Sequence, residues 1–462
     1  MRSSVRQSAT TATTQMPQTD NHYDFNNEIQ FLYFVSFSFP AVKKTVSRIS
    51  VNIEYAKTAL NSKFTSRSYS MEALAATRLD RFEKSMESLY GSFSNIKDPE
   101  KWTPPPNSGG HHGRYLWTDA FGVVNFLTLH QEHSKIAAAA GSASASGSSP
   151  GPGINIADKY LILARRLVET VHDILGRTRD GKARLPGATD ENPLGGGLRI
   201  GKLDETGVDG DGQYHHYLTI WMFALNRMSL ATGDPTYNRQ AVALAQAIHP
   251  RFFVNRTSTR PRMVWKMSMD LATPLVPSEG NLDPIDGYVV YRLLQASAMA
   301  MISCGSGNMG SDKGKVLDEE IADYKRVMER KGEHFVSADT LDLGMTLWTC
   351  HWFSDREKWA SKLAERCFQQ IYELFEIDRY LARNIKYRLA FREFGTCLGI
   401  GCHYGKSADA ERSIDLRTYS DSIIESWEPY MALSLRGDGD LLADDLRPIT
   451  RVMYSSALIP GG

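Results

Sequence analysis

Residues 214–231 read YHHYLTIWMFALNRMSLA, and this stretch decides the fold class. Apolar side chains occupy nearly every face of the helix that it predicts, so most of that helix must be buried. The next residues, 233–237 (GDPTY), predict a turn, because Asp234 can cap a second helix and Pro235 suits its first position. Tyr237 then leads a helix with one apolar face, formed by Ala241, Leu244, Ala245, Ile248 and Phe252.

One-sided helices of this kind recur along the chain, each after a more apolar helix. Tyr160 leads one with apolar residues at Ala164, Leu167, Val168, Val171, Ile174 and Leu175. Trp359 leads another with Leu363, Cys367, Ile371 and Phe375, and Ser354 with Glu357 predicts a capping box before it. The three leading aromatic residues are spaced by about two and about three helical hairpins.

Helical periodicity dominates the chain from residue 71 to residue 455. It predicts about ten to twelve helices, and residues 262–269 form the only strand candidate. The predicted fold class is therefore all-α. Repeated hairpins give an open solenoid or a closed ring, and alternating inner and outer helices favour an α/α toroid.

Three stretches carry a resemblance to a known family. They are residues 115–122 (YLWTDAFG), residues 211–217 (DGQYHHY) and the turn at 233–237. Together they resemble the six-hairpin glycosidase superfamily, over about residues 71–455. The resemblance implies an α/α toroid of the six-hairpin type and a carbohydrate ligand.

Composition limits the partners of the chain. The chain has 462 residues, and its 53 Lys plus Arg balance its 53 Asp plus Glu, so the net charge is zero. A general nucleic-acid binder needs an excess of basic residues. The chain has only five cysteines, which is too few for a disulfide scaffold and an odd number. This cysteine usage indicates a reducing compartment. The longest apolar stretch, residues 31–42, is too short to span a membrane. We expect a cytoplasmic protein with no nucleic-acid or membrane partner.

Two segments are expected to lie outside the packed core. Residues 1–70 lack periodicity, so we expect a disordered or non-native extension that precedes one toroid domain at residues 71–462. A good helical pattern opens at Met71. Residues 137–153 contain only Ala, Gly, Ser and Pro, and they predict a flexible loop inserted into that domain.

A long loop, about residues 178–212, ends in several acids just before the helix that carries His215 and His216. In a toroid, the funnel at one end of the inner helices is the natural ligand site. We expect Asp119, Asp211 and one of these two histidines to be catalytic there, at the N-terminal ends of neighbouring inner helices. Neither acid should be deeply packed. The ordinary alternative is that acids at helix N-termini only offset the helix dipole.

Further polar and aromatic residues are candidates for binding the substrate. They are Asp209 in the long loop, Asp286 at a helix start after Asp283, and Glu393 in the pair Arg392-Glu393. Trp117 and Trp265 could supply the flat apolar platforms that sugars need. The residues alone do not single out which two carboxylates would act as a pair.

We therefore predict a glycoside hydrolase that uses two carboxylates in the funnel, without a cofactor or a metal. One alternative is a sugar epimerase of the N-acylglucosamine type, in which histidines transfer protons. Another is a toroid that binds a ligand without catalysis. A zinc site at Cys350-His351, Cys397 and Cys402-His403 is the weaker chemistry, because the spacing fits no zinc motif and buried structural cysteines explain it.

Overall fold

The computed structural model describes residues 71–143, 155–207, 209–304, 316–332, 336–404, 410–436 and 447–461. All of these residues belong to one compact unit, Leu60–Gly462. The predicted extension, residues 1–70, and residues 144–153 of the predicted insert lie outside the described residues.

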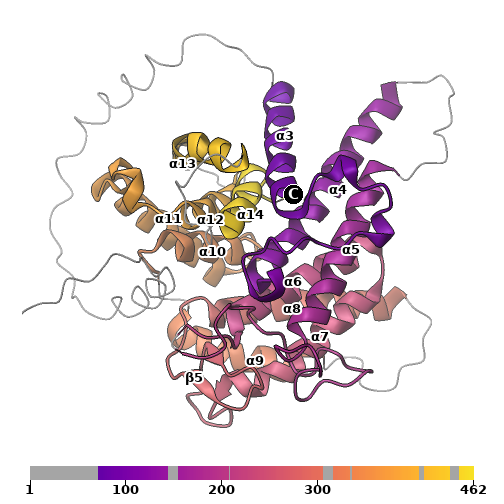
Figure 1. The fold of residues 1–462 in the computed structure, drawn as a ribbon. Helices are drawn as coiled ribbons and strands as arrows, with labels where there is room; N and C mark the ends of the chain where they lie inside the picture. The colour runs from indigo at the N-terminus through magenta and orange to yellow at the C-terminus, as the bar shows by residue number, and fades with distance from the viewer. Residues whose placement is uncertain are drawn as a thin grey trace, which may run out of the picture. The chain divides into compact units, whose positions relative to one another are not determined.

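Helices make up most of the described chain, which confirms the all-α prediction (Figure 1). The described residues form twelve α-helices: α3 (Met71–Tyr90), α4 (Leu116–Ala143), α5 (Ile156–Leu175), α6 (His215–Thr232), α7 (Pro235–Phe252), α8 (Asp283–Cys304), α9 (Asp318–Val327), α10 (Thr340–Cys350), α11 (Lys358–Tyr372), α12 (Ala390–Gly401), α13 (Ala410–Arg436) and α14 (Arg447–Leu458). Short 3-10 turns lie at Phe93–Asn95, Pro99–Lys101, His111–Gly113, Tyr380–Ala382 and Ile385–Tyr387, and π-helical turns at Met328–Gly332 and Glu373–Ile377. No helix among the described residues is both long and apolar enough to cross a membrane.

The even-numbered helices contact one another in sequence. α4 packs on α6, α6 on α8, α8 on α10, α10 on α12, α12 on α14, and α14 packs back on α4. The odd-numbered helices lie against them: α5 on α4, α7 on α6 and α8, α9 on α8, α11 on α10, α13 on α12, and α3 on α14.

Burial follows the two kinds of helix that the sequence predicts. In α6 every residue from 218 to 226 is buried, so this helix has no free face. The helix led by Trp359, α11, buries one face only, at Ala360, Leu363, Ala364, Cys367 and Ile371. The carboxylate of Asp234 caps α7 by accepting a hydrogen bond from the Thr236 N–H, with Pro235 in the first turn, as predicted.

Glycines allow α10 and α12 to approach closely. A Cβ added to Gly344 would lie 2.1 Å from the carbonyl oxygen of Gly395, and one added to Gly399 would lie 2.1 Å from that of Gly344. Because real Cβ atoms do not come this close to a carbonyl oxygen, the crossing requires residues without a side chain at these positions.

Three local predictions are wrong. The loop predicted at 137–153 begins too early, because α4 continues to Ala143 through a run of alanines, the best helix formers. The capping box at Ser354 is absent, since α11 starts at Lys358 after Glu357, whose side chain makes no cap hydrogen bond. The strand predicted at 262–269 is two short strands.

Short strands fix the loops that precede the helices. They are β1 (Gln213–Tyr214), β2 (Phe253–Val254), β3 (Arg262–Met263), β4 (Lys266–Met267) and β5 (Pro274–Val276). β4 lies between β1 and β5 in an antiparallel sheet, and β2 pairs with β3. Because β1 ends directly before His215, its pairing with β4 sets where α6 begins.

Candidate functional site

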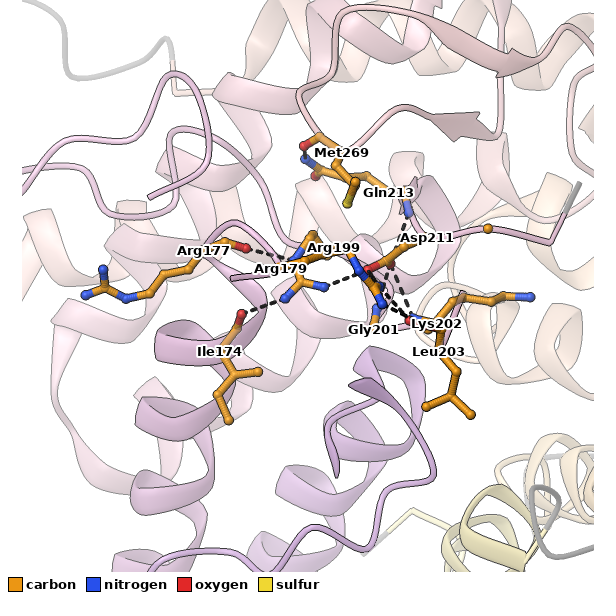
Figure 2. Close-up of polar contacts among 12 residues, drawn as sticks. Ile174, Arg177, Arg179, Arg199, Gly201, Lys202, Leu203, Asp211, Gln213 and Met269 are labelled. Atoms are coloured by element: carbon orange, nitrogen blue, oxygen red, sulfur yellow. Dashed lines mark hydrogen bonds and ion pairs between the residues drawn. The ribbon is translucent and has the colours of Figure 1, made fainter. Parts of the chain in front are cut away.

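Asp211 lies at the centre of a cluster that folds the long loop back on itself (Figure 2). Its Oδ2 accepts hydrogen bonds from Arg199 Nη1 at 2.6 Å and from Arg179 Nη1 at 2.9 Å. Its Oδ1 accepts the backbone N–H groups of Gly201 at 3.0 Å, Lys202 at 3.3 Å and Gly212 at 3.0 Å. Five protein donors therefore surround this carboxylate, and its side chain has no solvent exposure.

The arginines of the Asp211 cluster also bond to backbone carbonyls. Arg199 Nη2 donates to Ile174 O at 2.9 Å and its Nε to Arg177 O at 2.7 Å, which ties the cluster to the C-terminal end of α5. Arg179 donates to the carbonyl oxygens of Lys202 and Leu203. Arginine is therefore the cation that organises this loop, because its planar fork reaches several acceptors at once.

Asp119 is held in a second buried network. Its Oδ1 accepts from Ser108 Oγ at 2.6 Å, Tyr90 Oη at 3.2 Å and Arg114 Nη1 at 3.3 Å. Burial raises the pKa of Asp119, although its partners Arg114, Ser108 and Tyr90 act to lower it. The expectation that Asp119 and Asp211 are not deeply packed is therefore wrong. Their catalytic roles remain predictions, and these contacts favour structural roles for both.

Three of the predicted binding residues also make internal contacts. Glu393 is fully buried and accepts two hydrogen bonds from Arg388, at 2.8 and 2.6 Å, and one from the Trp427 indole at 2.8 Å. Trp265 donates its indole N–H to Ser278 Oγ at 3.1 Å and packs on Tyr214. Asp209 lies 3.9 Å from Lys202 Nζ.

The structure does bring Trp117, His216 and Asp286 together. His216 Nδ1 is ion-paired with Asp286, whose other oxygen accepts the hydroxyl of Thr349 at 2.8 Å. The rings of Trp117 and His216 lie 4.9 Å apart, centroid to centroid. These three residues stand in the first turns of α4, α6 and α8.

Two buried nitrogens in this group have no hydrogen-bond partner among the described residues. They are His216 Nε2 and the indole Nε1 of Trp117. Buried polar atoms in native proteins are usually hydrogen-bonded, so each such atom needs an explanation. A ligand that supplies an acceptor to the indole and a partner to the imidazole would provide one.

The protonation of His216 reflects its neighbours. Burial alone would lower the pKa of His216, but the charge of Asp286 and the bond to it outweigh burial, with smaller contributions from Asp283 and Asp342. The pKa of His216 is therefore raised. Its side chain is 13% exposed, whereas that of His215 is completely buried.

His215 faces away from this group. Its Nε2 is bonded to Tyr324 Oη at 2.5 Å, and its Nδ1 lies 3.1 Å from Asp283 Oδ1. Adjacent residues on a helix point about 100° apart, which explains why only one of the two histidines lies beside Trp117.

Sequence reasoning missed Asp342, in the first turn of α10. Burial, followed by the charge of Asp339, raises the pKa of Asp342 to about 6. Its Oδ2 accepts a hydrogen bond from Asn281 Nδ2 at 3.2 Å. A signal was present, because α8 and α10 both begin with the pattern Asp-x-x-Asp, at 283–286 and at 339–342.

We call Trp117, His216, Asp286, Thr349 and Asp342 the His216 site, and Asp342 is included because its charge acts on His216. It contains a carboxyl group with a raised pKa, a second carboxylate paired with a histidine, and an aromatic ring. Such a set can donate one proton, accept another and hold a flat apolar face of a ligand.

The four cysteines whose side chains the structure describes lie in the core. Cys350, Cys397 and Cys402 are buried, as expected for core residues, and burial raises the pKa of Cys397 to about 12. Within the described ranges, no three His, Cys, Asp or Glu side chains are grouped so that they could hold a metal ion.

Comparisons with protein-family models, with curated proteins and with solved structures gave no match for this chain.

Proposed function

We propose that this chain is a glycoside hydrolase on an α/α toroid of the six-hairpin type. The packing of the even-numbered helices supports the toroid, because each packs on the next from α4 to α14, and α14 packs back on α4. The odd-numbered helices, which pack against them, would form the outer layer. The His216 site would then lie at the end of the ring where the inner helices begin.

One observation carries the proposed reaction: two buried acids near His216 differ in their surroundings. Asp342 has its pKa raised to about 6, whereas Asp286 is bonded by His216 and Thr349. Pairs of titratable groups in contrasting environments are typical of acid and base assignments in glycoside hydrolysis. We assign Asp342 as the general acid and Asp286 as the base.

In this reaction Asp342 donates its proton to the glycosidic oxygen as the bond from that oxygen to the anomeric carbon breaks. A water molecule attacks the anomeric carbon and gives its proton to the Asp286 carboxylate. His216 positions Asp286 through its Nδ1, and Thr349 holds the other oxygen. Activity should therefore need protonated Asp342 and fall as the pH rises through about 6.

Aromatic side chains around Trp117 support a sugar as the ligand. The Tyr217 ring lies 5.2 Å from the Trp117 ring, and the hydroxyl of Tyr217 is 3.0 Å from that of Tyr115. The indole N–H of Trp117, which has no partner among the described residues, would donate to a sugar hydroxyl. Rings that combine an apolar face with a polar group suit sugars, which present both kinds of surface.

A sugar epimerase is the second candidate, and one observation favours it. The imidazole of His216 has one nitrogen fixed by Asp286 and the other, Nε2, without a partner among the described residues. That arrangement can move a proton at a sugar carbon.

We also propose a cytoplasmic location, supported by the sparse and odd number of cysteines.

The test is a product analysis with the full chain. Incubation with a panel of 4-nitrophenyl α- and β-glycosides should release 4-nitrophenolate, and NMR should show the free sugar. Asp342→Asn should lower kcat/KM, although by less on these activated substrates than on glycosides with a poorer leaving group, and the exposed loop variant Asp270→Asn should not change it. Solvent deuterium entering a free N-acyl sugar without hydrolysis would favour the epimerase, and binding without turnover would refute both enzymes.

A further inference from the structure

A cavity lies beyond the His216 site along α4 and α6. It has a volume of about 520 Å³ and is lined by parts of α4, α6, α10, α12 and α14. Five lining residues lie just outside these helices: His351, Trp352, Cys402, Ile459 and Gly461. It starts one helical turn further along than the site, since Phe121 follows Trp117 by one turn and Ile220 follows His216 by one turn. None of the five His216-site residues lines it. Its size is in the usual range for small-molecule sites.

Arg227 is the cation of this cavity. Burial lowers the pKa of Arg227 to about 10, so it remains charged at neutral pH. Its Nε donates to Asn226 Oδ1 at 3.1 Å, and its Nη2 donates to the same oxygen. Within the described ranges Arg227 bonds to Asn226 and not to a carboxylate, and no Asp, Glu or Lys lines the cavity. A partly buried charge without a counter-ion is costly, and a ligand anion would offset that cost.

Aromatic rings surround the Arg227 guanidinium. Its central carbon lies 5.1 Å from the centroid of the Phe223 ring and 4.8 Å from that of the Trp352 ring. The Trp348 ring packs on Phe223 at 4.8 Å. The indole N–H of Trp352 is buried and has no partner among the described residues, so the wall also offers a hydrogen-bond donor.

We propose that this cavity binds a small organic monoanion with a flat apolar body. The carboxylate of such a ligand pairs with Arg227, and its body lies against Phe223, Trp348 and Trp352. A single negative charge is favoured over the double charge of a phosphate monoester, because Arg227 is the one Lys or Arg among the described lining residues. This ligand site is additional to the sugar site proposed above.

Calorimetric titration of the full chain with 2-naphthoate tests the proposal, with the neutral amide 2-naphthamide as the matched probe. We expect naphthoate to bind at least about tenfold more tightly than naphthamide, as a charge-assisted hydrogen bond implies. Arg227→Gln should abolish this preference. Arg239→Gln, which removes an exposed arginine on α7 bonded to Thr236, should keep it.

Several results would overturn the proposal. They are equal binding of naphthoate and naphthamide, no binding of either at millimolar concentration, and naphthoate binding that survives in folded Arg227→Gln. Tighter binding of 2-naphthyl phosphate than of naphthoate would overturn the claim that the ligand carries a single negative charge. If Arg227→Gln does not fold, the comparison of the two probes on the wild-type chain decides the outcome.

Discussion

Asp211→Asn tests whether Asp211 is a structural residue or a catalytic one. The substitution keeps the shape of the side chain but removes the negative charge that two arginines share. It also places an amide N–H₂ where a carboxylate oxygen accepts hydrogen bonds. The Arg199 side chain has no solvent exposure, so its guanidinium would be left buried without a counter-ion.

The expected loss follows from these contacts. Breaking a buried ion pair by removing one partner costs about 3–5 kcal/mol, because the remaining charge stays desolvated. Arg179 is 14% exposed, so water could solvate it in part and keep the loss within that range. Since a domain has about 5–15 kcal/mol of stability, the variant should be severely destabilised.

Urea denaturation followed by tryptophan fluorescence measures this loss. Asp190→Asn is the matched control, because Asp190 is 89% exposed and pairs with Arg184, and such surface pairs contribute about 0–1 kcal/mol. A loss below about 1 kcal/mol in Asp211→Asn would refute the structural role. A variant that keeps wild-type stability but loses turnover would instead support the catalytic role predicted from the sequence.

Three further predictions concern the packing and titration of the helices. Gly344→Ala should lower the melting temperature and reduce the free energy of unfolding by about 1–3 kcal/mol, because the new Cβ would clash with the carbonyl oxygen of Gly395. A higher melting temperature, which is the usual result of Gly→Ala in a helix, would contradict the close crossing of α10 and α12. Asp234→Ala should lower the free energy of unfolding by about 1 kcal/mol in urea titrations, since it removes the cap of α7, and no loss would mean that the cap is not stabilising. Because the pKa of Asp342 is raised to about 6, its contribution to stability is lost as the pH rises through that value. Asp342→Asn should therefore gain stability relative to the wild type between about pH 4 and pH 7, and a difference independent of pH would refute the raised pKa.

The helical class and one turn could be predicted from local patterns. The apolar faces of 214–231 require burial, and α6 is buried without a break from 218 to 226. The cap at Asp234 depends on its immediate neighbours, so the sequence at 233–237 was enough to predict it. Both features depend on spacing within one helix or one turn.

The partners of the acids could not be predicted in this way. Asp211 does lie just before α6, but Arg179 and Arg199 reach it only because the long loop folds back, and no periodicity marks that path. The Asp-x-x-Asp pattern at 339–342 is visible in the sequence, but the raised pKa of Asp342 depends first on burial, which a pattern of residue types does not measure. Trp117, His216 and Asp286 were among the candidates, since each stands at a helix start.

The most direct test of the proposed function compares two leaving groups in Asp342→Asn. A general acid matters more when the leaving group is a poor one, so the loss in kcat/KM should be larger for a phenyl glycoside than for its 4-nitrophenyl analogue. We predict a loss of about 100-fold or more for the phenyl glycoside and a clearly smaller loss for the nitrophenyl one. Equal losses for the two substrates, or no loss for either, would contradict the assignment of Asp342 as the acid.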